Sequence, residues 1–171
     1  MKKLSKLFSQ KSKNRWHKVQ ANWSNFASGN PSKKIKIIGV TGTKGKTTIC
    51  NLIAGILDAA GEKCAMETTI NTKIGDSVTM HTEKSRWVTT PPTKVINNFL
   101  KKAIAAGCKY AILETTSQAI DQHRIYGLSF DVLVYSNLSH DHLDYHGTRE
   151  NYLAAKLKVF TDNPEATAII N

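Results

Sequence analysis

Residues 37–48 read Ile-Ile-Gly-Val-Thr-Gly-Thr-Lys-Gly-Lys-Thr-Thr, an apolar run that stops at a glycine-rich turn. In such a turn the backbone N–H groups point at phosphate oxygens, and the following helix adds its positive N-terminal end. The spacing is Gly-x-x-Gly-Lys-Thr, because the eight-residue form would need a glycine at Val40. An ordinary solvent-facing turn is the alternative. We predict a nucleotide site in which Lys46 is a point charge and Thr47 a hydroxyl ligand for magnesium.

The segment after the turn supports this interpretation. Apolar side chains repeat there at helical spacing, and a glycine closes the segment. These residues are Ile49, Leu52, Ile53, Ile56, Leu57 and Gly61. The predicted order is therefore strand, phosphate loop, helix.

The rest of the chain alternates between short apolar runs and helical periodicity. The runs predict strands at 63–70, 110–113, 130–135 and 166–170, and the periodicity predicts helices at 93–106 and 148–160. Residues 71–86 form a polar excursion with room for a short hairpin. Almost continuously apolar strands between helices indicate an α/β fold with a parallel sheet covered on both faces. Ligands of such sheets bind at the carboxyl ends of the strands, where the loop, Glu114 and Asn137 are expected to meet.

Length and composition bound the class of protein. A chain of 171 residues is long enough for one domain with a real core. It contains no apolar run of about 18 residues and no apolar signal segment, so we expect a cytoplasmic protein. The three cysteines, Cys50, Cys64 and Cys108, are dispersed, which predicts buried thiols in a reducing compartment and no cysteine chemistry.

The net charge of +11 is concentrated at the start of the chain. Twelve Lys or Arg and no Asp or Glu precede Asp58, whereas the remainder has 12 basic against 13 acidic residues. Residues 1–33 form a basic arm in which Trp16, Val19, Trp23 and Phe26 recur at near-helical steps. The simpler interpretation is a helix that packs this aromatic stripe on the domain. Docking on anionic lipid or nucleic acid is the alternative.

Polar residues at two strand ends carry the candidate chemistry. Glu114 ends an apolar strand, where a carboxylate is costly unless a cation meets it. After the next strand, residues 137–147 contain three His and two Asp within seven positions. By composition alone this cluster fits a zinc or iron site, or a polar loop. Beside a phosphate loop and Glu114, a hard-cation site next to a triphosphate is the better account.

Six motifs in order resemble the central domain of the Mur ligase family, over residues 34–171. They are Gly39-Val-Thr-Gly-Thr-Lys-Gly-Lys-Thr-Thr, Thr89-Thr-Pro, Glu114-Thr-Thr-Ser-Gln, Gln122-His-Arg, Asn137-Leu-Ser-His-Asp-His-Leu-Asp-Tyr-His-Gly and Tyr152-Leu-Ala-Ala-Lys156. Within the family the chain is most similar to the branch that adds the third residue to the muramyl peptide of peptidoglycan. The resemblance implies a P-loop α/β domain and ATP-dependent amide formation through an acyl phosphate.

The resemblance also implies roles for single residues. The triphosphate of ATP would contact Gly42, Thr43, Lys44, Gly45, Lys46, Thr47, Thr48 and Asn137. Lys46 would meet the β- and γ-phosphates and count as catalytic with Glu114, His142 and Lys156. Two Mg²⁺ ions would be held by Thr47, Glu114, His142 and Lys156. The lysine at the place of Lys156 is carbamylated in the family, whereas without the motif it would be a plain surface lysine.

Further residues match the family's contacts with the muramyl-peptide substrate, and they are Thr89, Thr90, Thr116 and Arg124. For His123, His140 and His146 we expect a structural role in ordering loops. Gln118 stands where histidine is usual, and Lys44 where asparagine is usual.

Relative to the family, the uridine-binding domain before the loop and the C-terminal domain that binds the incoming amino acid are missing. We therefore expect a fragment of a ligase, with no nucleic-acid partner. The alternatives are a ligase like folylpolyglutamate synthetase, or a non-catalytic nucleotide-binding or membrane-associated module. The motif Asp141-His-Leu-Asp-Tyr-His146 favours the muramyl branch.

Overall fold

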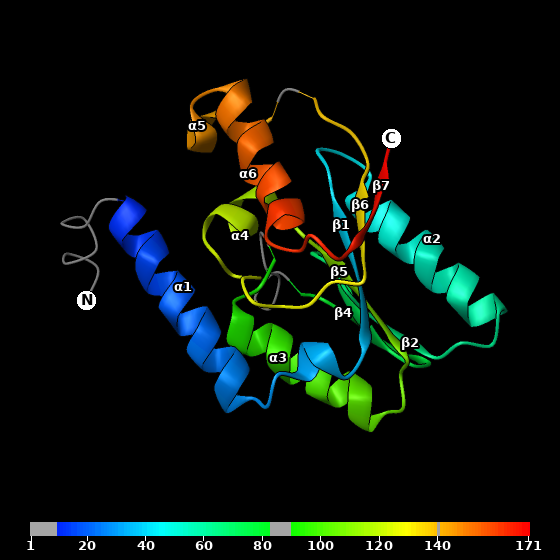
Figure 1. The fold of residues 1–171 in the computed structure, drawn as a ribbon. Helices are drawn as coiled ribbons and strands as arrows, with labels where there is room; N and C mark the ends of the chain where they lie inside the picture. Colours follow the sequence, from blue (N-terminus) through cyan, green and yellow to red (C-terminus); the bar gives the residue numbers. More distant parts are fainter. Residues whose placement is uncertain (1–9, 83–89, 140) are drawn as a thin grey trace.

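The computed structural model describes residues 10–82, 90–139 and 141–171, with the side chains described from residue 14 onward (Figure 1). A seven-stranded sheet has the order β4-β3-β2-β5-β1-β6-β7. The strands are β1 Lys36–Thr41, β2 Cys64–Glu67, β3 Asn71–Ile74, β4 Ser77–Met80, β5 Tyr110–Glu114, β6 Val132–Tyr135 and β7 Thr167–Ile170. Strands β2, β5, β1, β6 and β7, neighbours in that order, pair in parallel, which confirms the predicted fold class.

The polar excursion forms an antiparallel hairpin, β3 and β4, on the edge of β2. The second predicted strand was too long, because β2 ends at Glu67 rather than at residue 70. Thr68 causes this early end. Its hydroxyl accepts hydrogen bonds from the backbone N–H groups of Ile70 and Asn71, at 3.1 and 3.0 Å, and so turns the chain into β3.

Helices cover both faces of the sheet, as predicted (Figure 1). The helices are α1 Gln10–Ala27, the 3₁₀ turn η2 Pro31–Lys33, α2 Lys46–Ala59, α3 Thr93–Ala105, α4 Ser117–Asp121, α5 Leu143–His146 and α6 Arg149–Thr161. Residues of α2 pack with Val40, Met66 and Ile112 on one face. On the other face α3, α4 and α6 share a larger core with the strands. The short helices α4 and α5 lie where the sequence indicated loops.

Local signals explain where the long helices begin and end. Gly107, with φ of 76°, follows α3 and lets the chain turn back toward β5. Thr148 caps α6, because its hydroxyl accepts a hydrogen bond from the N–H of Asn151 at 3.2 Å. Cys50, Cys64 and Cys108 are buried free thiols, as predicted.

Helix α1 packs against α3, but not with its aromatic stripe, so the simpler interpretation of the arm is wrong (Figure 1). The packed face carries Ala21 and Asn25, which are 1% and 4% exposed, whereas Trp23 and Phe26 are 70% and 72% exposed. Small and amide side chains let α1 approach closely and make hydrogen bonds, which bulky rings would prevent. Every helix in the described part of the chain is too short or too polar to span a bilayer.

Candidate functional site

The sheet order gathers the predicted site residues at one edge. Strand β1 lies between β5 and β6, and their registers pair Val40 with Glu114 and Thr41 with Tyr135. The glycine-rich loop that follows β1 therefore emerges beside Glu114 on one side and Asn137 on the other. Because these strands are parallel, all three carboxyl ends open on the same crevice.

Asn137 holds the loop in place through the backbone of Lys44. Its Oδ1 accepts from the Lys44 N–H and its Nδ2 donates to the Lys44 carbonyl, both at 3.0 Å. The Ser136 hydroxyl donates to the same carbonyl at 3.0 Å. Asn137 therefore fixes the loop, although sequence reasoning assigned it to the nucleotide.

The loop glycines meet different conformational demands. Gly45 is the N-cap of α2 with φ of 80°, a left-handed conformation that favours glycine. A Cβ on Gly42 would lie 1.9 Å from the Ser136 hydroxyl oxygen. Thr48 is exposed in the first turn of α2, and the Lys44 side chain is exposed as well. Glycine conformations and close packing against Ser136 therefore fix the backbone of the loop.

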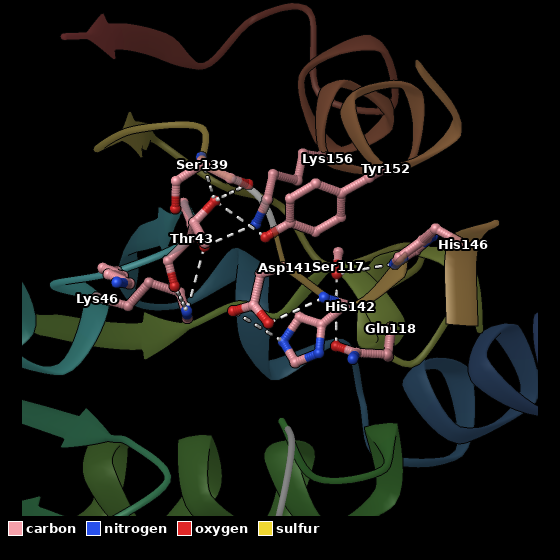
Figure 2. Close-up of polar contacts among 12 residues, drawn as sticks. Thr43, Lys46, Ser117, Gln118, Ser139, Asp141, His142, His146, Tyr152 and Lys156 are labelled. Atoms are coloured by element: carbon pink, nitrogen blue, oxygen red, sulfur yellow. Dashed lines mark hydrogen bonds and ion pairs between the residues drawn. The ribbon is translucent and has the colours of Figure 1, made fainter. Parts of the chain in front are cut away.

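Two lysine side chains converge on one carbonyl oxygen of the loop (Figure 2). Lys46 donates from Nζ to the Gly42 and Thr43 carbonyls at 3.1 and 2.9 Å. Lys156, from α6, donates from Nζ to the same Gly42 carbonyl at 2.6 Å and is 1% exposed. This arrangement places a second amine directly under the phosphate loop.

The Lys156 amine is unusually easy to deprotonate. Burial, followed by the positive charge of Lys46, lowers the pKa of Lys156 from 10.5 to about 7, and Asp141 opposes the shift. The Tyr152 ring, with its centroid 4.6 Å from Nζ, also favours the ammonium form. That contact contributes about 0.5–2 kcal/mol, less than the several kcal/mol that burial of an ammonium costs. Near neutral pH a large fraction of the amine is therefore uncharged.

Glu114 and Thr47 form an oxygen-rich corner beside the loop. Thr47 donates from its hydroxyl to the Glu114 carboxylate at 2.8 Å, and the Thr69 N–H donates to the same oxygen at 3.2 Å. Glu114 is 5% exposed and makes no ion pair with Lys or Arg among the described residues. A buried carboxylate and a hydroxyl fit a hard cation, which prefers oxygen ligands. The sequence did not indicate Thr69 as a site residue, because Thr69 lay inside the predicted strand 63–70.

His142 follows β6 and precedes α5, and its side chain is 40% exposed. Its Nε2 is 3.8 Å from the Asp141 carboxylate, and its φ of 52° is left-handed. Within the described ranges, no three His, Cys, Asp or Glu side chains gather as a metal-binding group. The structure therefore brings Thr47 and Glu114 together but leaves His142 in a separate contact with Asp141.

A hydroxyl network joins α6 to the loop (Figure 2). Tyr152 donates to the Thr43 hydroxyl at 3.1 Å, and that hydroxyl also accepts from the Ser139 N–H at 3.0 Å. Nearby, a ring nitrogen of His146 is 3.0 Å from the Ser117 hydroxyl. Tyr152 belonged to a quoted motif but received no role in the sequence analysis. Tyr152 is separated from Thr43 by 109 positions in the chain, so no local pattern predicts the contact.

The predicted substrate residues in the described part of the chain contact one another. The Thr90 hydroxyl donates to the Glu114 carbonyl at 2.8 Å and accepts from the Thr116 N–H at 3.0 Å. Arg124 donates from Nη1 to the Thr90 carbonyl at 2.9 Å, and burial lowers its pKa. Thr89 and His140 lie outside the described residues.

Arg124 also lines a groove of about 990 Å³ that runs between α1 and the start of α3. His123, in contrast, packs its ring edge-on against Tyr126 and has a ring nitrogen 3.3 Å from Lys158 Nζ. The groove therefore adjoins the predicted substrate residues through Arg124, which bonds to the Thr90 carbonyl.

A parallel α/β sheet with a glycine-rich phosphate loop at its carboxyl edge defines a P-loop class of nucleotide-binding domain. Residues 40–171 match the Mur ligase middle domain family. The chain belongs to this family.

Two relatives are ligases of the same name. The chain is 45% identical over 141 residues to UDP-N-acetylmuramoyl-L-alanyl-D-glutamate–2,6-diaminopimelate ligase of Parabacteroides distasonis, covering 81% of this chain and 28% of the relative. The ligase of the same name from Aquifex aeolicus is 41% identical over 143 residues, covering 84% and 29%. The chain thus spans little more than a quarter of the length of these relatives.

Solved structures agree on the fold. A structure of a ligase with that same name has a TM-score of 0.72 at 27% identity, covering 90% of this chain and 36% of that chain. Folylpolyglutamate synthase of Mycobacterium tuberculosis has a TM-score of 0.64, covering 90% and 41%, but its 16% identity supports the fold alone.

Proposed function

We propose that this chain provides the ATP-binding part of a ligase that joins an amino acid to a muramyl-peptide precursor of peptidoglycan. The observation that carries the proposal is the convergence of the loop, Glu114 and the buried Lys156 amine on one crevice. The ligases to which the chain is 41–45% identical support the choice of substrate. In the same proposal, residues 1–33 are a basic arm, residues 34–171 are the N-terminal portion of the ATP-binding domain, and the cytoplasm is the location.

In the proposed reaction, a substrate carboxylate attacks the γ-phosphorus of ATP, which releases ADP and forms an acyl phosphate. The amine of the incoming amino acid then displaces phosphate and forms the amide. The loop N–H groups and Lys46 would bind and orient the triphosphate. Tyr152 and Asn137 would keep the loop in its binding shape, and Arg124 would hold an anionic group of the substrate.

The corner made by Thr47 and Glu114 fits Mg²⁺, and these two residues would hold it. Mg²⁺ would supply positive charge that neutralises the triphosphate. His142 and a carbamylated Lys156 would hold a second ion in the proposed site. Rotation of His142 away from Asp141 would be needed for this role, since the two now lie together.

The proposal is tested by titrating the full chain with ATP, with and without Mg²⁺, in a calorimeter. Wild type is expected to bind only with Mg²⁺, and Glu114→Gln is expected to lose about tenfold or more of that affinity, because a charged ligand becomes a neutral amide. Glu67→Gln is the matched control, since Glu67 is also buried at the end of a strand, and should bind as wild type does. Mg²⁺-independent binding, or equal losses in both variants, would refute the proposed site.

Carbamylation of Lys156 is a separate prediction. Only an uncharged amine reacts with CO₂, and a pKa of about 7 supplies one at pH 8, where an ordinary lysine stays protonated. Carbon-13 NMR of the protein in labelled bicarbonate should show a carbamate signal. The signal should vanish in Lys156→Met and persist in Lys158→Met, whose lysine lies two positions away on the same helix. A signal that survives in Lys156→Met would exclude this site.

A further inference from the structure

One surface of the molecule is not explained by the proposed ligase site. Trp16, Val19, Trp23 and Phe26 of α1 are 62%, 60%, 70% and 72% exposed. Residues spaced three or four apart share one face of a helix, so these side chains form a continuous apolar stripe. The Trp23 and Phe26 ring centroids are 6.3 Å apart. The stripe is therefore an unpartnered aromatic face, which in a folded protein marks an interaction site.

The opposite face of α1 already holds the helix on the domain. Asn25 donates from Nδ2 to the Tyr126 carbonyl at 3.0 Å, and its Oδ1 accepts from Asn97 at 2.9 Å. Farther along the helix, Asn14 donates to the Asp121 carboxylate at 3.1 Å. Hydrogen bonds of these side-chain amides, one buried and two partly buried, fix the rotation of the helix about its axis. The stripe therefore stays exposed, while α1 lies against α3 (Figure 1).

The charged residues of α1 itself are all basic. Helix α1 carries Lys11, Lys13, Arg15 and Lys18, and no acidic residue precedes Asp58 in the chain. Arg15 is exposed and is the neighbour of Trp16 in sequence. Lys18 instead lies over the Tyr126 ring, with Nζ 4.4 Å from its centroid. An exposed aromatic face next to the exposed Arg15, on a helix without acidic residues, is complementary to an apolar surface rimmed by anions.

We propose that α1 docks on an anionic lipid bilayer, with the stripe in the interface and Arg15 beside it at the headgroups. Exposed Trp and Phe of a helix insert at the boundary of headgroups and acyl chains, and basic residues near them are attracted to anionic lipid. A second copy of the chain would place two wholly basic helices face to face, which repels. Docking does not depend on the proposed ligase function, because none of these residues belongs to the nucleotide site.

The experiment is co-sedimentation of the full chain with vesicles of phosphatidylcholine, with and without phosphatidylglycerol. Wild type should bind the anionic vesicles, and its tryptophan emission should shift to the blue. Substitution of Trp16, Trp23 and Phe26 by serine should weaken binding about tenfold or more, because the buried apolar area is lost. Lys13→Glu with Arg15→Glu should do the same, and about 0.5 M salt should weaken the wild type.

The matched control is Leu52→Ser with Ile56→Ser, which removes exposed apolar side chains from α2 instead. This variant should bind vesicles as wild type does. Circular dichroism should show that all variants keep the wild-type fold, since the replaced side chains described by the structure are exposed. Three results would overturn the proposal. They are no binding to anionic vesicles, binding that the stripe variant retains, and a stripe that instead mediates self-association or RNA binding in scattering and gel-shift measurements.

Discussion

Replacement of Lys46 by alanine is expected to abolish measurable binding of Mg²⁺ and ATP to this chain. The Lys46 amine lies against the Gly42 and Thr43 carbonyls, where the loop N–H groups of a P-loop domain surround phosphate. Its removal takes away a positive charge and, in the proposed site, the hydrogen bonds to the β- and γ-phosphates. A charge-assisted contact of this kind contributes about 3 kcal/mol, so the affinity should fall by about 100-fold or more. Titration calorimetry of both proteins measures the difference.

Lys44→Ala provides the control within the same loop. The Lys44 side chain is exposed, and Asn137 holds only its backbone, which alanine retains. Its removal should lower the affinity for ATP no more than about threefold, as expected for an exposed charge. Equal affinities of wild type and Lys46→Ala would mean that nucleotide does not bind at this loop.

The second large effect is expected from Gly42→Ala, which should destabilise the fold by about 2–5 kcal/mol and prevent nucleotide binding. The added Cβ would lie 1.9 Å from the Ser136 hydroxyl oxygen and 3.2 Å from the Asn137 backbone nitrogen. A φ of 148° adds backbone strain in a residue with a side chain. Strain and overpacking each cost about 1–3 kcal/mol. Urea denaturation reports the loss as a lower midpoint.

Two further variants distinguish the steric clash at Gly42 from a general effect of replacing glycine by alanine. Gly55→Ala, inside α2, places its Cβ in open space and should raise the free energy of unfolding by about 0.5–1 kcal/mol. Adding Ser136→Ala to Gly42→Ala removes the closest oxygen and should restore part of the lost stability. If Gly42→Ala unfolds at the wild-type midpoint, the close packing of the loop against Ser136 is wrong.

Local sequence patterns predicted the long helices and the strands of the parallel sheet, but not the short helices α4 and α5. The strand, loop and helix of residues 36–59 follow from apolar runs, glycines and helical spacing, which act between neighbours in the chain. The edge where the loop, Glu114 and Asn137 meet also followed from the sequence, because parallel strands separated by helices present their carboxyl ends together. The boundary of β2 was misjudged, since the turn at Thr68 depends on one hydroxyl rather than on periodicity.

Only the tertiary structure decided how distant side chains meet. Lys46 and Lys156 bond to the same Gly42 carbonyl, and burial then lowers the Lys156 pKa, although nothing near Lys156 in the chain encodes either effect. Likewise, the sequence shows that α1 is amphipathic, but the surface of α3 selects which face packs. Asn97 offers amide hydrogen bonds there, so Asn25 turns inward and Trp23 remains outside. Which face of α1 packs depends on the side chains that α3 presents to it. These two helices are far apart in the sequence, so only the folded structure shows the choice.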